Sequence, residues 1–167
     1  MLKESIDAKS IDLNIFYLAV NNLIALPIDG GSITWFEPPP FETVTDSSSI
    51  ATANINLTKG SSNEKLSCNF SLSADLSLVA GSIKLGGSSV ASFVPSQQSP
   101  SVQTGFENRF NVTWVPNKLT LILLNVTSAE EGEYRCEVLS VGVSIQTWAR
   151  AIQVYLLGDT HAKDLSP

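Results

Sequence analysis

The chain has 167 residues, of which 43% are hydrophobic and 16% are charged, and its 10 Lys+Arg against 16 Asp+Glu give a net charge of −6. This charge argues against a general nucleic-acid binder, which needs a basic surface to displace counterions, and against a polybasic protein of the membrane surface. The hydrophobic fraction is too high for a disordered chain. We therefore expect one folded domain with tails.

The two ends of the chain differ from its middle. Residues 1–30 contain an apolar run at 15–20 that Asn21 and Asn22 interrupt. A secretory signal places positive charge before its apolar region, whereas here acids stand there, so this stretch is interpreted as a divergent signal peptide or a wrongly assigned N-terminal segment. No run approaches the roughly 20 apolar residues of a membrane span. Because the tail at 159–167 is polar, the chain is expected to be secreted or to be a fragment of an anchored protein.

From residue 31 onward, short stretches alternate between polar and apolar residues, as strands with one buried face do. Three prolines at 38–40 stop the first of these strands, which is therefore expected at a sheet edge or in a linker. A short helical turn is expected at 127–131, with Thr127 or Ser128 as its N-cap. In chain order, the expected strands are 33–36, 50–57, 64–72, 76–85, 90–94, 110–114, 119–124, 134–138 and 148–157.

This series of short strands predicts an all-β sandwich or barrel. Cys68 and Cys136 both fall on apolar strand faces. Together with His161 they are too few ligands for a structural zinc site. Two buried free thiols and one disulfide both fit this pattern, and the disulfide requires an oxidising compartment.

The segment 121–136 resembles the region around strands E and F of immunoglobulin V-type domains. In that family, apolar residues at the end of strand E are followed by an acid, a glycine, a tyrosine and the second cysteine. Here the acid is a glutamate where the family prefers aspartate. The matching residues are Leu121, Leu123, Val126, Glu130, Gly132, Tyr134 and Cys136.

The resemblance covers roughly residues 41–157 and implies an all-β, immunoglobulin-like two-sheet Greek-key sandwich of V type over 31–158. It also implies a disulfide between Cys68 and Cys136, and it settles the choice left open above. The spacing of the two cysteines leaves room for the additional strands C′ and C″.

Three structural roles follow from the same resemblance. Tyr134 is expected to be a tyrosine corner, whose hydroxyl bonds to backbone upstream. Arg109 is expected to form a salt bridge with Glu130. Gly132, Leu121 and Leu123 are expected to be structural residues of the same region.

Two departures from the family pattern limit what the resemblance implies. The tryptophan of strand C is missing, and Ile83 is expected to take its place. Residues 146–150 replace the Gly-x-Gly bulge of strand G, so pairing of the antigen-receptor kind is not expected. The chain is more similar to divergent V-type ectodomains of invertebrate surface receptors and adhesion proteins.

Four N-x-[ST] sequons indicate glycosylation and an extracellular location, at Asn56, Asn69, Asn111 and Asn125. The V-type comparison places Asn56, Asn111 and Asn125 on or near the A/B/E/D sheet, which leaves the G-F-C-C′ face free for a partner. The candidate binding residues are outward positions of strands F and G, although such residues are often no more than solvated: Arg135, Glu137, Leu139, Gln153 and Tyr155.

No catalytic, cofactor-binding or metal-binding set is predicted. Glu130 has a structural role in the V-type comparison, and Glu131 and Glu133 are expected on an exposed turn. We expect a non-enzymatic extracellular domain that binds a protein, either another copy of itself or a different protein, in adhesion or as a receptor ectodomain. The alternative is a carbohydrate- or pattern-binding module that uses its tryptophans: Trp114 is expected partly in the core, and Trp35 and Trp148 at edges.

Overall fold

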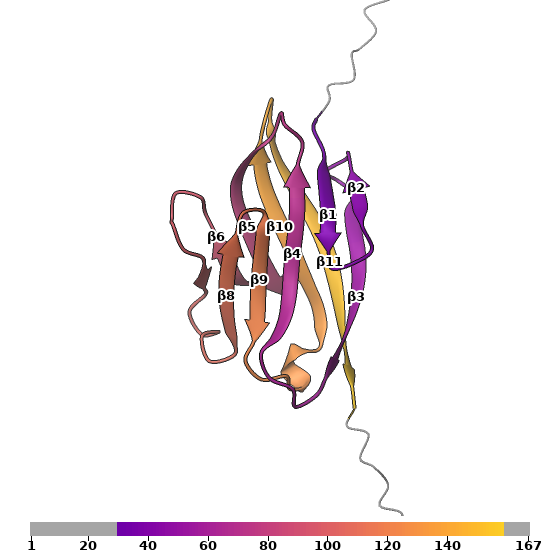
Figure 1. Cartoon of the computed structure of the whole chain (residues 1–167), viewed down its shortest axis with the longest axis vertical. Coiled ribbons are helices and arrows are strands. Elements are labelled where there is room, and N and C mark those ends of the chain that lie inside the picture. The colour runs from indigo at the N-terminus through magenta and orange to yellow at the C-terminus, as the bar shows by residue number, and fades with distance from the viewer. Residues whose placement is uncertain (1–29, 159–167) are drawn as a thin grey trace, which may run out of the picture.

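Two β-sheets pack face to face in the structure, a computed structural model that describes residues 30–158 (Figure 1). The first sheet has the strand order β2-β1-β4-β9-β8 and the second has the order β3-β11-β10-β5-β6-β7. The strands of the first sheet are β1 Ile33–Glu37, β2 Glu42–Val44, β4 Glu64–Leu72, β8 Phe110–Val115 and β9 Lys118–Leu123. Those of the second are β3 Ile50–Thr58, β5 Ser77–Leu85, β6 Ser88–Phe93, β7 Ser101–Val102, β10 Gly132–Val141 and β11 Ile145–Leu157.

All strand pairs are antiparallel except one, in which β3 runs parallel to β11. In immunoglobulin terms, β1, β4, β9 and β8 are strands A, B, E and D, and β5, β10 and β11 are strands C, F and G. The short strands β6 and β7 are C′ and C″, while β3 is the part of strand A that crosses to the other sheet. The protein is therefore an all-β, immunoglobulin-like Greek-key sandwich of V type.

The core lies between the sheets because alternate residues of each strand point inward. On β4 the inward residues are Leu66, Cys68 and Phe70, and on β10 they include Tyr134 and Cys136. All of these are almost completely buried. Burial of a large apolar side chain contributes about 1.5–3 kcal/mol, so this alternation is the main stabilising feature of the fold.

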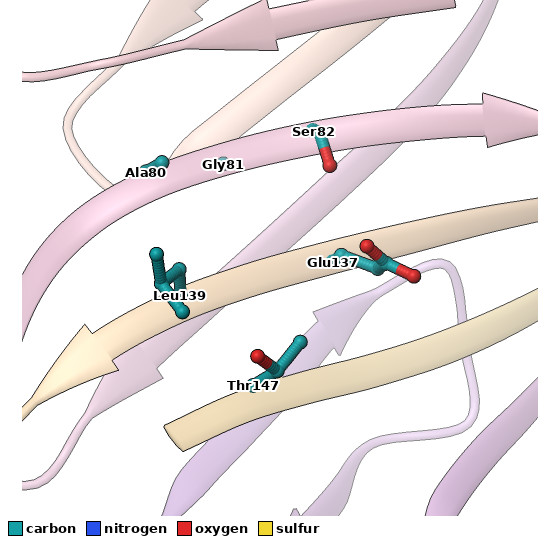
Figure 2. Close-up of a pocket in the computed structure, with 6 residues that line it drawn as sticks. All are labelled: Ala80, Gly81, Ser82, Glu137, Leu139 and Thr147. Carbon is teal, nitrogen blue, oxygen red and sulfur yellow. The ribbon is translucent and has the colours of Figure 1, made fainter. Parts of the chain in front are cut away.

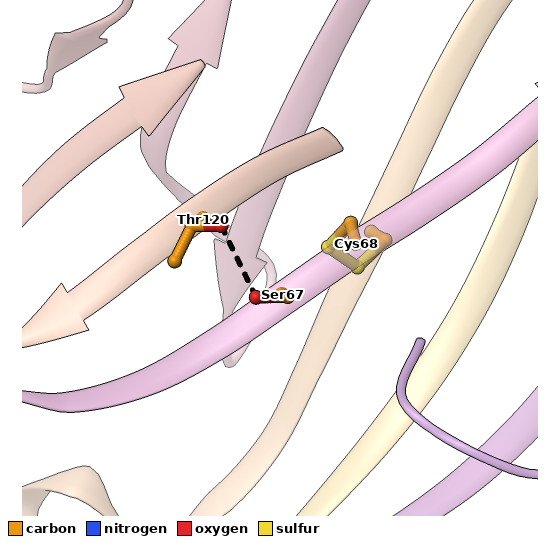
Figure 3. Close-up of a disulfide and its surroundings, with 4 residues drawn as sticks. Ser67, Cys68 and Thr120 are labelled. Carbon is orange, nitrogen blue, oxygen red and sulfur yellow. Dashed lines mark hydrogen bonds between the residues drawn. A yellow bond between two sulfur atoms is a disulfide. The ribbon is translucent and has the colours of Figure 1, made fainter. Parts of the chain in front are cut away.

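A disulfide between Cys68 of β4 and Cys136 of β10 joins the two sheets through the core (Figure 3). The two Cα atoms are 6.1 Å apart, and the cysteines are 68 residues apart in the chain. Ile83 of β5 is fully buried and pairs with Cys136 in the sheet, as expected for the residue that replaces the missing tryptophan of strand C.

The first strand is not at an edge, contrary to the expectation drawn from the prolines at 38–40. The chain turns back after β1, and the short strand β2 covers the edge of β1, which therefore lies between β2 and β4. Trp35 points inward from β1 and is buried in the core, where its ring meets the ring of Phe70 edge-on at 5.9 Å.

Trp148 is also buried, so its expected place at an edge is wrong as well. It lies on β11 opposite Val138, and its indole Nε1 donates a hydrogen bond to Ser140 Oγ at 2.9 Å. The long strand β11 lies between β3 and β10, and its inward side chains from Trp148 to Val154 are buried.

Arg150 is an inward residue of β11 that the alternation pattern did not single out. Its guanidinium is buried and donates a hydrogen bond to the carbonyl of Pro40 at 2.6 Å. Burial lowers the pKa of Arg150, and the nearby carboxylate of Glu42 opposes that change. This contact fixes the turn after β1 against the second sheet.

Candidate functional site

The outward surface of the second sheet contains a shallow hollow of about 220 Å³ (Figure 2). It lies over β5, β10 and the first part of β11, where small side chains leave room above the sheet. Leu139 contributes an apolar side chain, and Glu137 contributes a carboxylate. The lining residues are Ala80, Gly81, Ser82, Glu137, Leu139 and Thr147.

Charged side chains flank one side of this hollow. Glu137 forms a salt bridge with Lys84 Nζ of the neighbouring strand at 2.7 Å. Arg135, two positions along β10, places its Nε 3.3 Å from the other carboxylate oxygen of Glu137. Exposed pairs of this kind contribute only about 0–1 kcal/mol to stability, so their main effect is to orient two cations beside the hollow.

An apolar hairpin tip, residues 141–145, extends from the same surface at one end of the sandwich (Figure 1). Val141 follows Leu139 by two residues and pairs with Ile145 across the hairpin. Ile145 is 72% exposed and Val143 is 91% exposed. Together with Leu139, these residues make an apolar strip from the hollow to the tip.

The five expected binding residues fall into two groups. Arg135, Glu137 and Leu139 form one outward row on β10, and two of them line the hollow. Gln153 and Tyr155 lie farther along β11, where they pair with Asn54 and Asn56 of β3 and do not reach the hollow.

Sequence reasoning missed the residues that complete the hollow from the neighbouring strands. Ala80 and Ser82 come from β5, and Thr147 comes from β11 directly opposite Leu139. Their alternation marks them as outward, but only the register of β5 against β10, which places Ala80 beside Leu139, brings them together.

The corner between β9 and β10 shows the expected ion pair of the V-type domain. Arg109 Nε donates a hydrogen bond to Glu130 Oε1 at 2.9 Å, and the Glu130 side chain is only 2% exposed. Burial alone would raise the pKa of Glu130, but hydrogen bonds from Thr127 and the Arg109 guanidinium outweigh it and lower the pKa. Thr127 is the N-cap of the 3₁₀ helix Ser128–Glu130 and forms a capping box with Glu130.

Tyr134 occupies the position of a tyrosine corner, but its hydroxyl does not make the expected bond to upstream backbone. The hydroxyl is buried, and it has no hydrogen-bond partner within residues 30–158. Burial, with a smaller effect from the Glu130 carboxylate, raises its pKa far above the ordinary range.

Asn56 lies on the second sheet, not on or near the A/B/E/D sheet as expected. The reason is that β3 crosses over and pairs with β11, which puts Asn56 beside Tyr155. Asn111 lies on β8 of the first sheet, and Asn125 is exposed just after β9. Asn69 lies on the interior strand β4 and is half-buried.

Two further features are absent from the described part of the chain. Within residues 30–158, no group of three or more His, Cys, Asp or Glu side chains is arranged to hold a metal ion. The same residues contain no helix that is long and apolar enough to cross a membrane. Glu131 and Glu133 are exposed, and His161 and the segments 1–29 and 159–167 lie outside the described residues.

Comparisons with known proteins find similarity among solved structures. No protein-family model matches the chain, and no curated protein matches it. Among solved structures, the chain is similar to murine CRIg, with 15% identity and a TM-score of 0.46, over 61% of this chain and 92% of that one. The fold assignment rests on the strand order and pairing described above.

Proposed function

We propose that the protein is an extracellular, non-enzymatic domain that binds a protein partner through the hollow and the adjoining hairpin tip. The observation that carries this proposal is the apolar strip from Leu139 to Val143, which continues from a concave surface onto a protruding loop. Exposed apolar surface of this kind is stabilised by contact with another protein.

The chemistry of the surface indicates what such a partner presents. A small apolar side chain fits a shallow hollow floored by strand backbone and lined by Leu139, Ala80 and Thr147. The Lys84 and Arg135 cations beside it favour a partner with a carboxylate at the rim, and this helps to set the orientation of binding.

The extracellular location is supported by the disulfide, because such bonds persist in oxidising compartments, and by the four sequons. Adhesion between two copies and binding of a different receptor both remain compatible with one such surface. Measuring self-association first separates these two possibilities.

A carbohydrate-binding function has less support. Trp35 and Trp148 are buried, and Trp114 is stacked on Phe93 with ring centroids 4.0 Å apart. Trp35 and Trp148 therefore offer no ring face to a sugar, and one face of the Trp114 ring is covered by Phe93.

Sedimentation velocity of the glycosylated protein over a wide concentration range tests self-association. A multimerised form, applied to a panel of cells that each display one ectodomain, tests binding to other proteins. We expect Leu139→Arg to weaken binding about 100-fold in whichever of the two assays detects it, because the substitution places an uncompensated charge at the centre of the surface.

The matched control is Val115→Arg, an exposed apolar position at the end of β8 on the first sheet. It introduces the same side chain away from the hollow and is expected to leave binding unchanged. Equal loss of binding in both variants, or full binding by Leu139→Arg, would contradict the proposed surface.

A further inference from the structure

The open edges of the two sheets differ greatly in length. Each sheet has two outer strands, which pair with a neighbour on one side only. One outer strand of each sheet is very short, namely β2 with 3 residues and β7 with 2 residues. The other is long, namely β8 with 6 residues in the first sheet and β3 with 9 residues in the second.

Long edge strands are a hazard, since their unpaired backbone groups accept a strand from another molecule. Short edge strands are one means of avoiding such pairing. This accounts for β2 and β7, but it leaves β3 and β8 without that protection.

Each of the two long edge strands carries one of the four sequons. Asn56 is in the second half of β3, and Asn111 is the second residue of β8. Both side chains are exposed on the outward surface of their sheets. On β8, Asn111 Oδ1 also accepts a hydrogen bond from the backbone amide of Val112 at 2.8 Å.

We propose that Asn56 and Asn111 carry N-linked oligosaccharides that cover the two long edges and prevent edge-to-edge association. The inference rests on the extracellular location proposed above. A strand added to either edge would lie about 4.8 Å from β3 or β8, well within the space that an oligosaccharide on the adjacent side chain occupies.

The remaining two sequons provide a contrast. Asn69 lies on interior strand β4 between Glu37 of β1 and Lys118 of β9. The Lys118 and Glu37 side chains form an ion pair of 2.6 Å across this strand, and a glycan on Asn69 would have to displace it. Asn125 is exposed but lies outside the strands, so a glycan there covers no edge.

Site occupancy is the first part of the test. The full chain is expressed in insect cells behind an added cleavable secretion signal, and glycopeptides are quantified by mass spectrometry. We expect Asn56 and Asn111 to be modified in most molecules and Asn69 to be largely unmodified. Unmodified Asn56 or Asn111 in secreted, folded protein would overturn the inference.

Self-association of sequon variants is the second part. Asn56→Gln combined with Asn111→Gln is expected to associate at a concentration about tenfold lower than the unaltered protein in sedimentation velocity. The control Asn125→Gln loses the same kind of glycan without opening an edge and is expected to behave like the unaltered protein. If the double variant stays monomeric, or if the control associates equally, the edge-protection role is wrong.

Two further variants keep the result interpretable. Thr58→Ala with Thr113→Ala removes both glycans while retaining both asparagines, so it replaces the first double variant if that one does not fold. Leu139→Arg added to the double variant distinguishes the edges from the hollow. Association that persists supports the edges, whereas association that disappears assigns it to the hollow and overturns the inference without contradicting the proposed function.

Discussion

The outward surfaces of the two sheets satisfy their polar groups in different ways. On the first sheet, polar side chains pair with one another. Thr34 and Thr43 (2.9 Å) and Ser67 and Thr120 (3.1 Å, Figure 3) pair between neighbouring strands, and Glu37 and Lys118 pair across the intervening strand β4. On the second sheet, small side chains surround the hollow, and Leu139 leads to an apolar hairpin tip.

This difference indicates which surface is suited to binding. Cross-strand polar pairs stabilise the first sheet without a partner. Covering them with a partner would cost desolvation free energy that few new hydrogen bonds offset. The second sheet presents apolar surface whose contact with another protein is favourable. Phe36, Phe41 and Val115 are also exposed on or beside the first sheet, so the contrast between the two surfaces lies in the hollow and the hairpin tip.

Removal of the disulfide is expected to have the largest effect and to affect both surfaces equally, because Cys68 and Cys136 join the two sheets. Cys68→Ala combined with Cys136→Ala releases a loop constraint of 68 residues, which is about 4 kcal/mol of unfolding free energy in the chain-entropy model. Denaturant unfolding measures this loss. A loss below about 1 kcal/mol would show that the rest of the core holds the sheets together without it.

The Arg109–Glu130 ion pair gives a pH-dependent contribution, since it joins the start of β8 to the corner before β10. The pKa of Glu130 is lowered from its ordinary 4.5, so its contribution is present above that pH and is lost as the pH falls through the folded-state pKa. We expect Arg109→Ala to reduce stability at pH 7 by about 2–3 kcal/mol, because it leaves a buried carboxylate without its cation.

Glu130→Gln provides the comparison for this pH dependence. It keeps the size of the side chain and removes the titrating group, so its stability is expected to fall less between pH 6 and pH 3 than that of the unaltered protein. If the free energy of unfolding falls equally with pH in the two proteins over this range, other carboxylates determine the acid sensitivity.

Val143→Asp examines how far the binding surface extends toward the hairpin tip. The side chain is 91% exposed and makes little contribution to the core, so we expect unfolding free energy to change by less than about 0.5 kcal/mol. Partner binding is expected to weaken about tenfold, which is less than for Leu139→Arg at the centre of the surface. Unchanged affinity would restrict the surface to the hollow.

Lys84→Ala is expected to have only a small effect on stability, since the Lys84–Glu137 pair is partly exposed. The expected loss is about 0.5 kcal/mol, and it should diminish at high salt. Association kinetics with the partner, measured at low and high salt, are a sharper readout, because cations at the rim affect mainly the association rate. Equal salt dependence in both proteins would remove Lys84 from the recognition surface.

Local pattern was sufficient for a large part of the fold. Period-two alternation identified strands such as 64–72 and 134–138, and the acid, glycine, tyrosine and cysteine after β9 indicated a V-type sandwich. The turn at 127–131 is confirmed as the 3₁₀ helix Ser128–Glu130, because an N-cap threonine followed three residues later by glutamate is a local signal.

What only the tertiary structure decided is which strands are neighbours. A strand's own residues show which side chains face inward, but they do not specify its partner, because backbone hydrogen bonding is the same for every sequence. The crossing of β3 to the second sheet placed Asn56 beside Tyr155, and the pairing of β2 with β1 moved Trp35 from the edge of the sheet to an inner strand. Register likewise assembled the hollow, because Ala80 and Thr147 are far apart in the chain and meet only where β5 and β11 flank Leu139.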